Sequence, residues 1–304
     1  MTPPTEASAR SAGFQPASDS SLRANFPQPL NRATLLKLFS AAVFAFLYLP
    51  IAVLILYSFH RGGVAGFPPK HFTLNWYRQL FSDSALWDSV LNSLLVAAGA
   101  VVLSLILGLL AALALDRATF PGKNLFRRLV LLPLILPGII TGLSLLMFAN
   151  FAGLNLSLWT VFLGHATALI SVATTELFAG LQKLDRAQEE ASLDLGANHW
   201  KTFWRITLPN LRVSLIAAGL LIFTLSLDEI AVSFFLIGRD NTLPLEIWSR
   251  LRRGITPEIN AISTVILLFS IATILVWYRL RTQTEHIEEG GASLLASTLE
   301  GGQP

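Results

Sequence analysis

Six long apolar runs dominate the sequence and restrict the chain to folds that a lipid bilayer can accommodate. They cover residues 35–59, 90–115, 129–151, 156–178, 215–237 and 259–280. A helix rises ~1.5 Å per residue, so about 20 apolar residues cross a hydrocarbon core of ~30 Å. Helices satisfy their own backbone groups, as a membrane span requires. We therefore predict an all-α membrane protein with about six transmembrane helices.

The composition also indicates a lipid environment. Apolar residues make up 53% of the 304 positions and charged residues 13%, whereas soluble domains carry about 25% charged residues. The chain has no cysteine, and its five histidines lack a metal-binding spacing, so we expect no metal site and no cofactor. The pI of about 9.4 would suit nucleic acid, but the basic residues lie in short tracts beside apolar runs, as membrane topology requires. We expect no nucleic-acid partner.

The distribution of charge predicts the domain layout and the orientation. Residues 1–30 are rich in Pro, Ser and Ala and lack the apolar core of a signal peptide, so we expect a disordered cytoplasmic tail. A transmembrane domain at 31–284 and a flexible tail at 285–304 follow. Most of the 22 lysines and arginines fall on one side if the N-terminus is cytoplasmic, with a cluster near residue 250 as the exception. Both termini are therefore expected in the cytoplasm.

The connection at residues 180–212 differs from the others because charged and apolar residues alternate at helical spacing. Its apolar face is formed by Ala191, Leu195, Trp200, Phe203 and Ile206. Such a helix lies in water or against a partner rather than in lipid. Gly196 can adopt a positive φ and so divide the segment into two helices, and Pro209 suits the start of the next span.

Residues 190–209, EASLDLGANHWKTFWRITLP, resemble the EAA motif of permease subunits of binding-protein-dependent ABC importers. That motif reads Glu-Ala-Ala, then Gly four residues later, then Ile-x-Leu-Pro beginning ten residues beyond the Gly. Ser192 stands for the second alanine, a small-for-small change. The resemblance assigns a set of residues to coupling with an ATPase: Glu190, Ala191, Ser192, Gly196, Ala197, Ile206, Leu208 and Pro209.

The resemblance implies a type I ABC importer permease fold in the bacterial plasma (inner) membrane, with a coupling helix pair that docks in a groove of the ATP-hydrolysing subunit. The chain contains no P-loop of the form G-x-x-x-x-G-K-[ST], so we expect a non-catalytic subunit beside a separate ATPase. The partners implied are two ATPase subunits, a second homologous permease subunit, a periplasmic or extracellular solute-binding protein and membrane lipid. Whether the pore is a homodimer or a heterodimer stays open.

Residues 225–266, LSLDEIAVSFFLIGRDNTLPLEIWSRLRRGITPEINAISTVI, are similar to the second permease subunit of spermidine/putrescine importers. The similarity implies half of a translocation path for a polyamine. The alternatives are a permease of the same family for another small solute, or a secondary transporter. A secondary transporter would favour inverted repeats, and a membrane-embedded enzyme would need a motif such as H-E-x-x-H. The sequence shows neither feature.

Three acidic residues fall within apolar runs, where a charge costs about 2.5–3.5 kcal/mol on insertion scales. Asp228, Glu229 and Glu176 are therefore candidates for the substrate path. Adjacent helical residues point about 100° apart, so Asp228 and Glu229 do not face one partner together. Contacts between helices or within a subunit interface are the alternative role.

Other local signals predict kinks and short helices. The stretch LLPLILPGII, with Pro133, Pro137 and Gly138, predicts a kinked or broken third span, either a gate or a plain kink. Residues 72–81 predict a short amphipathic segment, and residues 244–252 a short helix. Arg239, Arg250 and Arg253, in or near that helix, are candidate contacts to the solute-binding protein, unless they are simply solvated.

Overall fold

The computed structural model describes residues 32–61, 71–254, 256–272 and 275, so the tails expected at 1–30 and 285–304 lie outside the described residues. The chain divides into two compact units, residues 1–53 and 54–304. The first unit contributes most of α1 (Arg32–Tyr57), a helix that is long and apolar enough to cross a membrane. Most of its side chains are exposed, as suits a helix covered by lipid.

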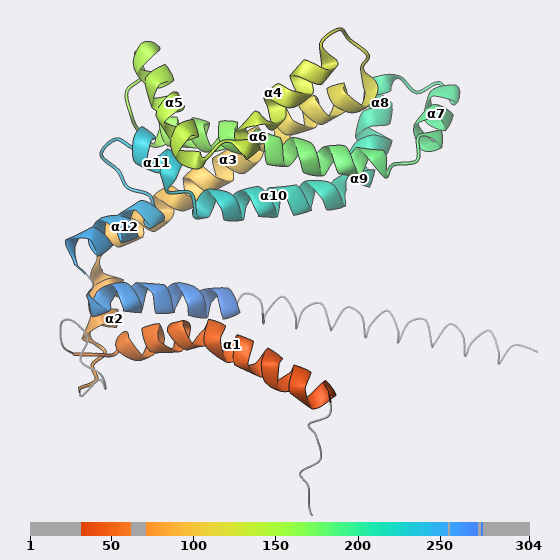
Figure 1. Cartoon of the computed structure of the whole chain (residues 1–304). Helices are drawn as coiled ribbons and strands as arrows, with labels where there is room; N and C mark the ends of the chain where they lie inside the picture. The colour runs from red at the N-terminus through yellow and green to blue at the C-terminus, as the bar shows by residue number, and fades with distance from the viewer. Residues whose placement is uncertain (1–31, 62–70, 255, 273–274, 276–304) are drawn as a thin grey trace, which may run out of the picture. The chain divides into compact units, whose positions relative to one another are not determined.

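Three helices form the centre of the second unit (Figure 1). They are α3 (Ser84–Arg117), α6 (Leu158–Gln182) and α10 (Arg212–Leu227), and each packs against the other two. Small residues permit this close approach, as is typical of membrane helices. A Cβ atom at Gly108 of α3 would lie 2.4 Å from the Cβ of Ala173 in α6, and Ala112 and Leu177 are fully buried between the helices.

The third apolar run forms two helices that meet at a sharp bend. α4 (Lys123–Ile135) and α5 (Gly138–Phe151) are inclined at 111° to each other. Pro137 lacks a backbone N–H group and lies between them, whereas Pro133 is tolerated within α4. The expected break is therefore confirmed, and Pro137 marks its position.

The fifth apolar run, in contrast, is not the continuous span that we predicted. α10 ends at Leu227, residues 228–230 are not helical, and α11 (Ala231–Leu236) follows. α11 packs against α5 and α6. A Cβ atom at Gly138 would lie 3.3 Å from the Cβ of Ala231 and 3.7 Å from Oε1 of Glu229, so the breaks in the third and fifth runs meet.

Two amphipathic helices lie near the N-terminal end of α3. They are α2 (Asn75–Ser82) and α12 (Leu243–Arg253), and both expectations of short helices there are confirmed. A small apolar core of Leu80, Leu86 and Ile262 joins α2, α3 and the helix Pro257–Ala272. Within the described residues the β structure is a single isolated bridge between His60 and Phe72.

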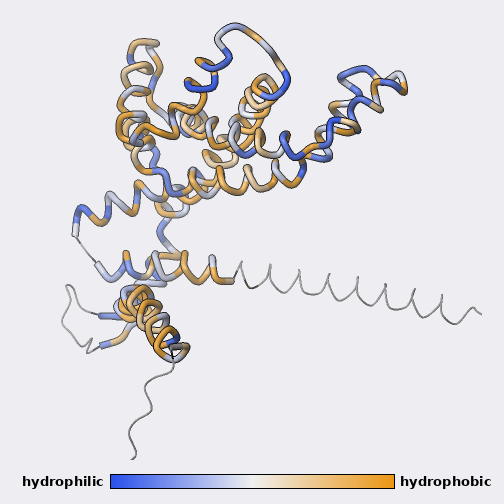
Figure 2. Tube along the Cα trace, turned by 45° about the vertical axis from the view of Figure 1, so that its right-hand side comes forward, coloured by the Kyte–Doolittle hydropathy of each residue, from blue (hydrophilic) through white to orange (hydrophobic). Residues whose placement is uncertain are grey.

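Four short helical pieces connect α6 with α10. They are α7 (Ala187–Asp194), α8 (His199–Thr202), a π-helix (Phe203–Thr207) and α9 (Leu208–Asn210), here called the α7–α9 segment. Figure 2 shows many hydrophilic residues in α7 and α8, as also in α12 and at the start of α4, whereas apolar residues follow α3, α6 and α10. This contrast separates a water-facing or partner-facing segment from lipid-facing helices.

The structure therefore contains the expected all-helical membrane architecture in modified form. Three described helices are long and apolar enough to cross a membrane, and two bent pairs, α4 with α5 and His199–Asn210 with α10, raise the number to as many as five. The sixth predicted span is described as the apolar helix Pro257–Ala272, and the rest of it lies largely outside the described residues.

Candidate functional site

The α7–α9 segment owes its shape to three local features. Gly196 has a φ of 86° and separates α7 from α8, as expected from the sequence. Oδ1 of Asn198 accepts a hydrogen bond of 2.8 Å from the Lys201 N–H and caps α8. The hydroxyls of Ser192 and Thr202 lie 3.0 Å apart and join the two helices. The segment is therefore a closed helical hairpin.

The π-helix that follows accommodates Pro209. Proline has no N–H group to donate within the helix, and the chain widens one turn before it, so that the Leu208 N–H donates to the carbonyl of Phe203. Leu211 then donates to the carbonyl of Thr207 at 3.0 Å, and α10 begins at Arg212. The segment thus passes into the membrane helix without a free loop.

Half of the motif residues predicted to contact an ATPase line one cleft. Ala191, Ser192, Ala197 and Ile206 form its walls together with Leu195, whose surface is 90% exposed. Glu190 is exposed close by, and no described residue bonds to its carboxylate. Leu208 and Pro209, in contrast, shape the backbone at the start of α10. Four of the eight motif residues therefore share one exposed cleft, here called the α7–α8 cleft, and their contact with an ATPase stays a prediction.

Aromatic side chains extend the exposed apolar surface beyond the cleft. Trp200, Phe203 and Trp204 contact one another, with ring centroids 5.6–6.1 Å apart. Both tryptophans are more than half exposed. Aromatic residues are enriched at protein interfaces, where they bury large areas, so this surface is suited to a protein partner.

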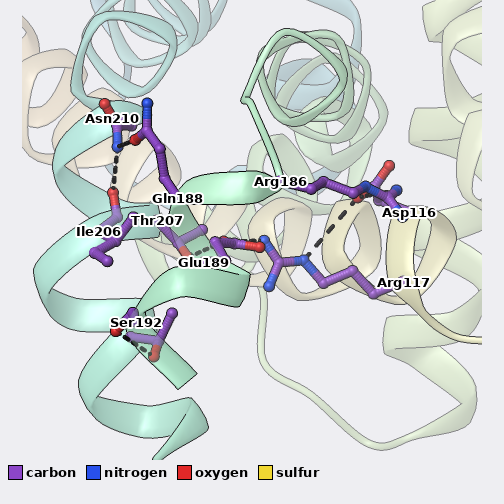
Figure 3. A network of polar contacts seen from close by, with 10 residues as sticks. Asp116, Arg117, Arg186, Gln188, Glu189, Ser192, Ile206, Thr207 and Asn210 are labelled. Carbon is purple, nitrogen blue, oxygen red and sulfur yellow. Dashed lines mark hydrogen bonds and ion pairs between the residues drawn. The ribbon is translucent and has the colours of Figure 1, made fainter. Parts of the chain in front are cut away.

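Sequence reasoning missed the residue that anchors the segment. Glu189, directly before the motif glutamate, is buried; its Oε1 accepts from Nη2 of Arg117 at 2.5 Å and from the hydroxyl of Thr207. Nη2 of Arg186 lies 3.1 Å from Oδ2 of Asp116. Figure 3 shows these contacts between α7 and the C-terminal end of α3. The available signal was the pair of adjacent glutamates, because neighbouring helical residues point about 100° apart and only one can face inward.

A second polar contact closes the other side of the segment. Nδ2 of Asn210 donates to Oε1 of Gln188 at 3.0 Å and to the carbonyl of Ile206 at 2.8 Å. α7 is therefore tied both to α3, through Glu189, and to the start of α10, through Gln188. We call the Arg117–Glu189–Thr207 contact the polar joint.

The three acidic candidates for a substrate path have different surroundings. Asp228 is exposed in the break between α10 and α11, and no described residue bonds to its carboxylate. Glu229 accepts from the Val232 N–H at 3.0 Å through Oε1, which caps α11. Glu176 is partly buried in α6, eleven residues or about 16 Å from His165, which contacts both sides of the break. The structure thus brings Asp228 and Glu229 together at the break but not Glu176.

Arg250 is not the free surface cation that a contact with a binding protein would need. Its guanidinium bonds to Asp83 at 2.6 Å, Glu246 at 2.9 Å and Glu258 at 2.5 Å, and its side chain is 12% exposed. The hydrogen bond from Arg250 holds the pKa of Asp83 below its usual value. Burial opposes the charge on Arg250, but the carboxylates outweigh burial and raise its pKa. Arg250 therefore ties α12 to the start of α3.

Comparison with known proteins identifies relatives. Residues 104–285 match the family described as binding-protein-dependent transport system inner membrane component. The chain is 33% identical to the spermidine/putrescine transport system permease protein PotC of Haemophilus influenzae over 258 residues, 84% of this chain and all of the relative. It is 37% identical to the putrescine transport system permease protein PotI of Escherichia coli over 260 residues, 81% of this chain and 91% of the relative.

Solved structures support the fold. A chain of a bacterial ABC transporter involved in the import of the acidic polysaccharide alginate matches with a TM-score of 0.61 and 17% identity, over 89% of this chain and 99% of that one. A chain from the alginate transporter in complex with a pentasaccharide-bound periplasmic protein matches with a TM-score of 0.60 and 15% identity, over 81% and 92% of the two chains. The type I importer permease fold is thus confirmed.

Proposed function

The chain belongs to the family of binding-protein-dependent transport system inner membrane components, and we propose that it forms half of the path through which an ATP-driven importer takes up a polyamine. Residues 31–284 are assigned as the permease domain. The observation that carries this proposal is the α7–α9 segment, which exposes motif residues on one side and is fixed to a membrane helix on the other.

The two adjacent glutamates divide these tasks between them. Glu190 and the α7–α8 cleft face outward and are available to a separate ATP-hydrolysing subunit. Glu189 faces inward and joins α7 to Arg117 at the end of α3. A helical hairpin held at its base moves as one body, so a displacement of α7 by the ATPase is passed to α3 and α10. Helix-in-groove docking of this kind needs an exposed apolar face, which Leu195 and Trp200 supply.

The assembly that this function needs has several other subunits. The chain lacks a P-loop, so a separate ATPase dimer hydrolyses ATP and this subunit is not catalytic. A second homologous permease subunit completes the path, and a solute-binding protein delivers the solute from outside. The α7–α9 segment, and with it both termini, is assigned to the cytoplasmic side of a bacterial inner membrane because basic residues concentrate there.

The proposed solute follows from the relatives and from one carboxylate. The matched permeases PotC and PotI carry the names of spermidine and putrescine transport systems. The Asp228 carboxylate has no partner among the described residues and lies at the break in an apolar run. An unpaired carboxylate attracts an ammonium group by a Coulomb interaction, which is stronger beside low-dielectric protein and lipid than in bulk water. Asp228 is therefore the first choice for a contact with a polyamine, and Glu229 and Glu176 are weaker choices.

The test is solute-stimulated ATP hydrolysis and uptake by the complete importer in proteoliposomes, measured with polyamines, amino acids and oxyanions. We expect stimulation by putrescine or spermidine. Asp228→Asn should raise the half-saturating polyamine concentration while the complex still assembles. Asp240→Asn is the matched control, because Asp240 is exposed outside both helices. Equal uptake by the two variants would remove Asp228 from the path, and stimulation by another solute class alone would overturn the polyamine assignment.

A further inference from the structure

His165 connects the two sides of the break in the fifth apolar run. It lies in α6 with 1% of its surface exposed. Its Nδ1 is 2.8 Å from the hydroxyl of Ser226, the penultimate residue of α10, and its Nε2 is 2.9 Å from the hydroxyl of Ser233 in α11. Both serines are buried. One imidazole ring thus bridges α10 and α11, which the chain connects only through the non-helical residues 228–230.

The hydrogen bonds fix which ring nitrogen carries the proton. The Ser233 hydroxyl has one proton and donates it to the carbonyl of Glu229 at 2.9 Å. Towards His165 the same oxygen must therefore accept, so Nε2 carries the proton. Nδ1 is then an acceptor, and the Ser226 hydroxyl donates to it. A neutral ring in this tautomer satisfies every polar atom of the bridge, as burial requires.

The hydrogen-bonded bridge, rather than the local sequence, fixes the position of the break between α10 and α11. Residues 225–231, LSLDEIA, contain neither proline nor glycine, so backbone chemistry alone does not end α10 at Leu227. Close packing adds to the bridge, since a Cβ atom at Gly164 would lie 2.3 Å from Leu236 and 2.9 Å from Val232 of α11. Within the part of the chain that the structure describes, the two bonds to His165 are the only side-chain hydrogen bonds between residues 226–233 and α6, and both are lost without the ring.

We propose that His165 is a positioning residue, which fixes the facing ends of α10 and α11 against α6 so that the Asp228 carboxylate stays exposed and unpaired at the break. Asp228 lies between the two serines in sequence, and the Glu229 carbonyl beside it is bonded to Ser233. Its geometry is therefore set from α6. The transport part of this inference rests on the proposed function, whereas the structural part does not.

Spin labels test the structural part. The chain has no native cysteine, so labels at Leu220→Cys in α10 and Phe234→Cys in α11, both exposed, report the separation of the two helices in the assembled importer. We expect His165→Leu to broaden or shift the distance distribution. Thr167→Val is the control and should leave the distribution unchanged, because among the described residues the Thr167 hydroxyl bonds only to the carbonyl of Leu163 in its own helix.

Uptake kinetics test the transport part. The loss of two buried hydrogen bonds should raise the half-saturating putrescine concentration about 10-fold in His165→Leu, with a smaller change in the maximal rate. His165→Asn retains a polar group near Ser226, and His165→Gln one near Ser233, so both should lie between wild type and His165→Leu. A mere folding defect would instead lower the amount of complex and the maximal rate together.

If His165→Leu does not assemble, the double variant Ser226→Ala with Ser233→Ala tests the positioning role instead, because it removes both hydrogen bonds and keeps the imidazole ring. Wild-type distances and wild-type half-saturation in these variants would overturn the positioning role. A wild-type importer that takes up no polyamine would overturn the proposed function instead, and the spin-label comparison would still decide whether His165 fixes the break.

Discussion

Replacement of Glu189 by alanine tests the polar joint. The change removes a carboxylate that is 12% exposed. It leaves the Thr207 hydroxyl without its acceptor, and it leaves Arg117 only its 4.0 Å ion pair with Asp116. Arg117 is 38% exposed, so water replaces part of its bond and we count about 1 kcal/mol for it. Thr207 is fully buried, and an unsatisfied hydroxyl costs at least about 1 kcal/mol. The total of about 2 kcal/mol corresponds to about 30-fold in the equilibrium between joined and separated segments.

The assay is the number of polyamine molecules taken up per ATP hydrolysed by the reconstituted importer. Glu189→Ala should bind the ATPase normally, because the exposed cleft is unchanged, but its uptake per ATP should fall by up to about 30-fold. Glu190→Ala, the adjacent exposed glutamate, should instead weaken ATPase binding. Asp194→Asn in the same helix is exposed and should behave as wild type.

A double-mutant cycle isolates the contact. Glu189→Ala and Arg117→Ala should be non-additive by about 1 kcal/mol, because each removes the same bond. The reasoning is refuted if Glu189→Ala retains wild-type uptake per ATP, or if the two effects simply add.

Three further predictions concern other parts of the fold. Gly196→Trp should abolish ATPase binding in a pull-down assay, whereas Gly196→Ala should lose only about 1–2 kcal/mol through its positive φ; normal binding by the tryptophan variant would contradict the docking surface. Gly142→Ala should lower the free energy of unfolding by about 1–3 kcal/mol, seen as a lower melting temperature, because the new Cβ would lie 2.9 Å from a backbone oxygen of α11. Gly219→Ala is the control and should leave the melting temperature unchanged, because its Cβ would meet no atom closer than 3.5 Å. Asp83→Asn should lower the melting temperature at pH 7, because a carboxyl with a depressed pKa stabilises the fold above its unfolded pKa of about 4. The difference from wild type should shrink as the pH falls below about 4 and disappear once the pH lies below the folded pKa; a pH-independent difference would contradict the ion pair with Arg250.

Local chemistry made several elements predictable from sequence. Apolar runs predicted the membrane helices. Pro137 indicated a break because proline restricts φ and lacks a backbone N–H, and Gly196 indicated a turn because glycine readily adopts a positive φ. Ala191 and Leu195 were expected on one face because they lie four residues apart, and both line the α7–α8 cleft.

Tertiary contacts explain what the sequence did not reveal. The break after Leu227 depends on His165, which is about 60 residues away in the chain, and no turn residue announces it. Glu189 was overlooked beside Glu190 because the face that packs on Arg117 is fixed only when α3 and α7 meet. From the sequence we interpreted Arg250 as a surface cation, because its three carboxylate partners come together around it only in the folded chain.

The sidedness of the α7–α9 segment is the most direct measurement of the central claim. A single Leu195→Cys, at a position that is 90% exposed, can be labelled with a membrane-impermeant maleimide in intact cells and in inverted membrane vesicles, with Asp240→Cys as the residue expected on the opposite side. We predict that Leu195→Cys is labelled only in inverted vesicles and is protected when the ATPase is bound. Labelling of Leu195→Cys from outside intact cells would contradict the account.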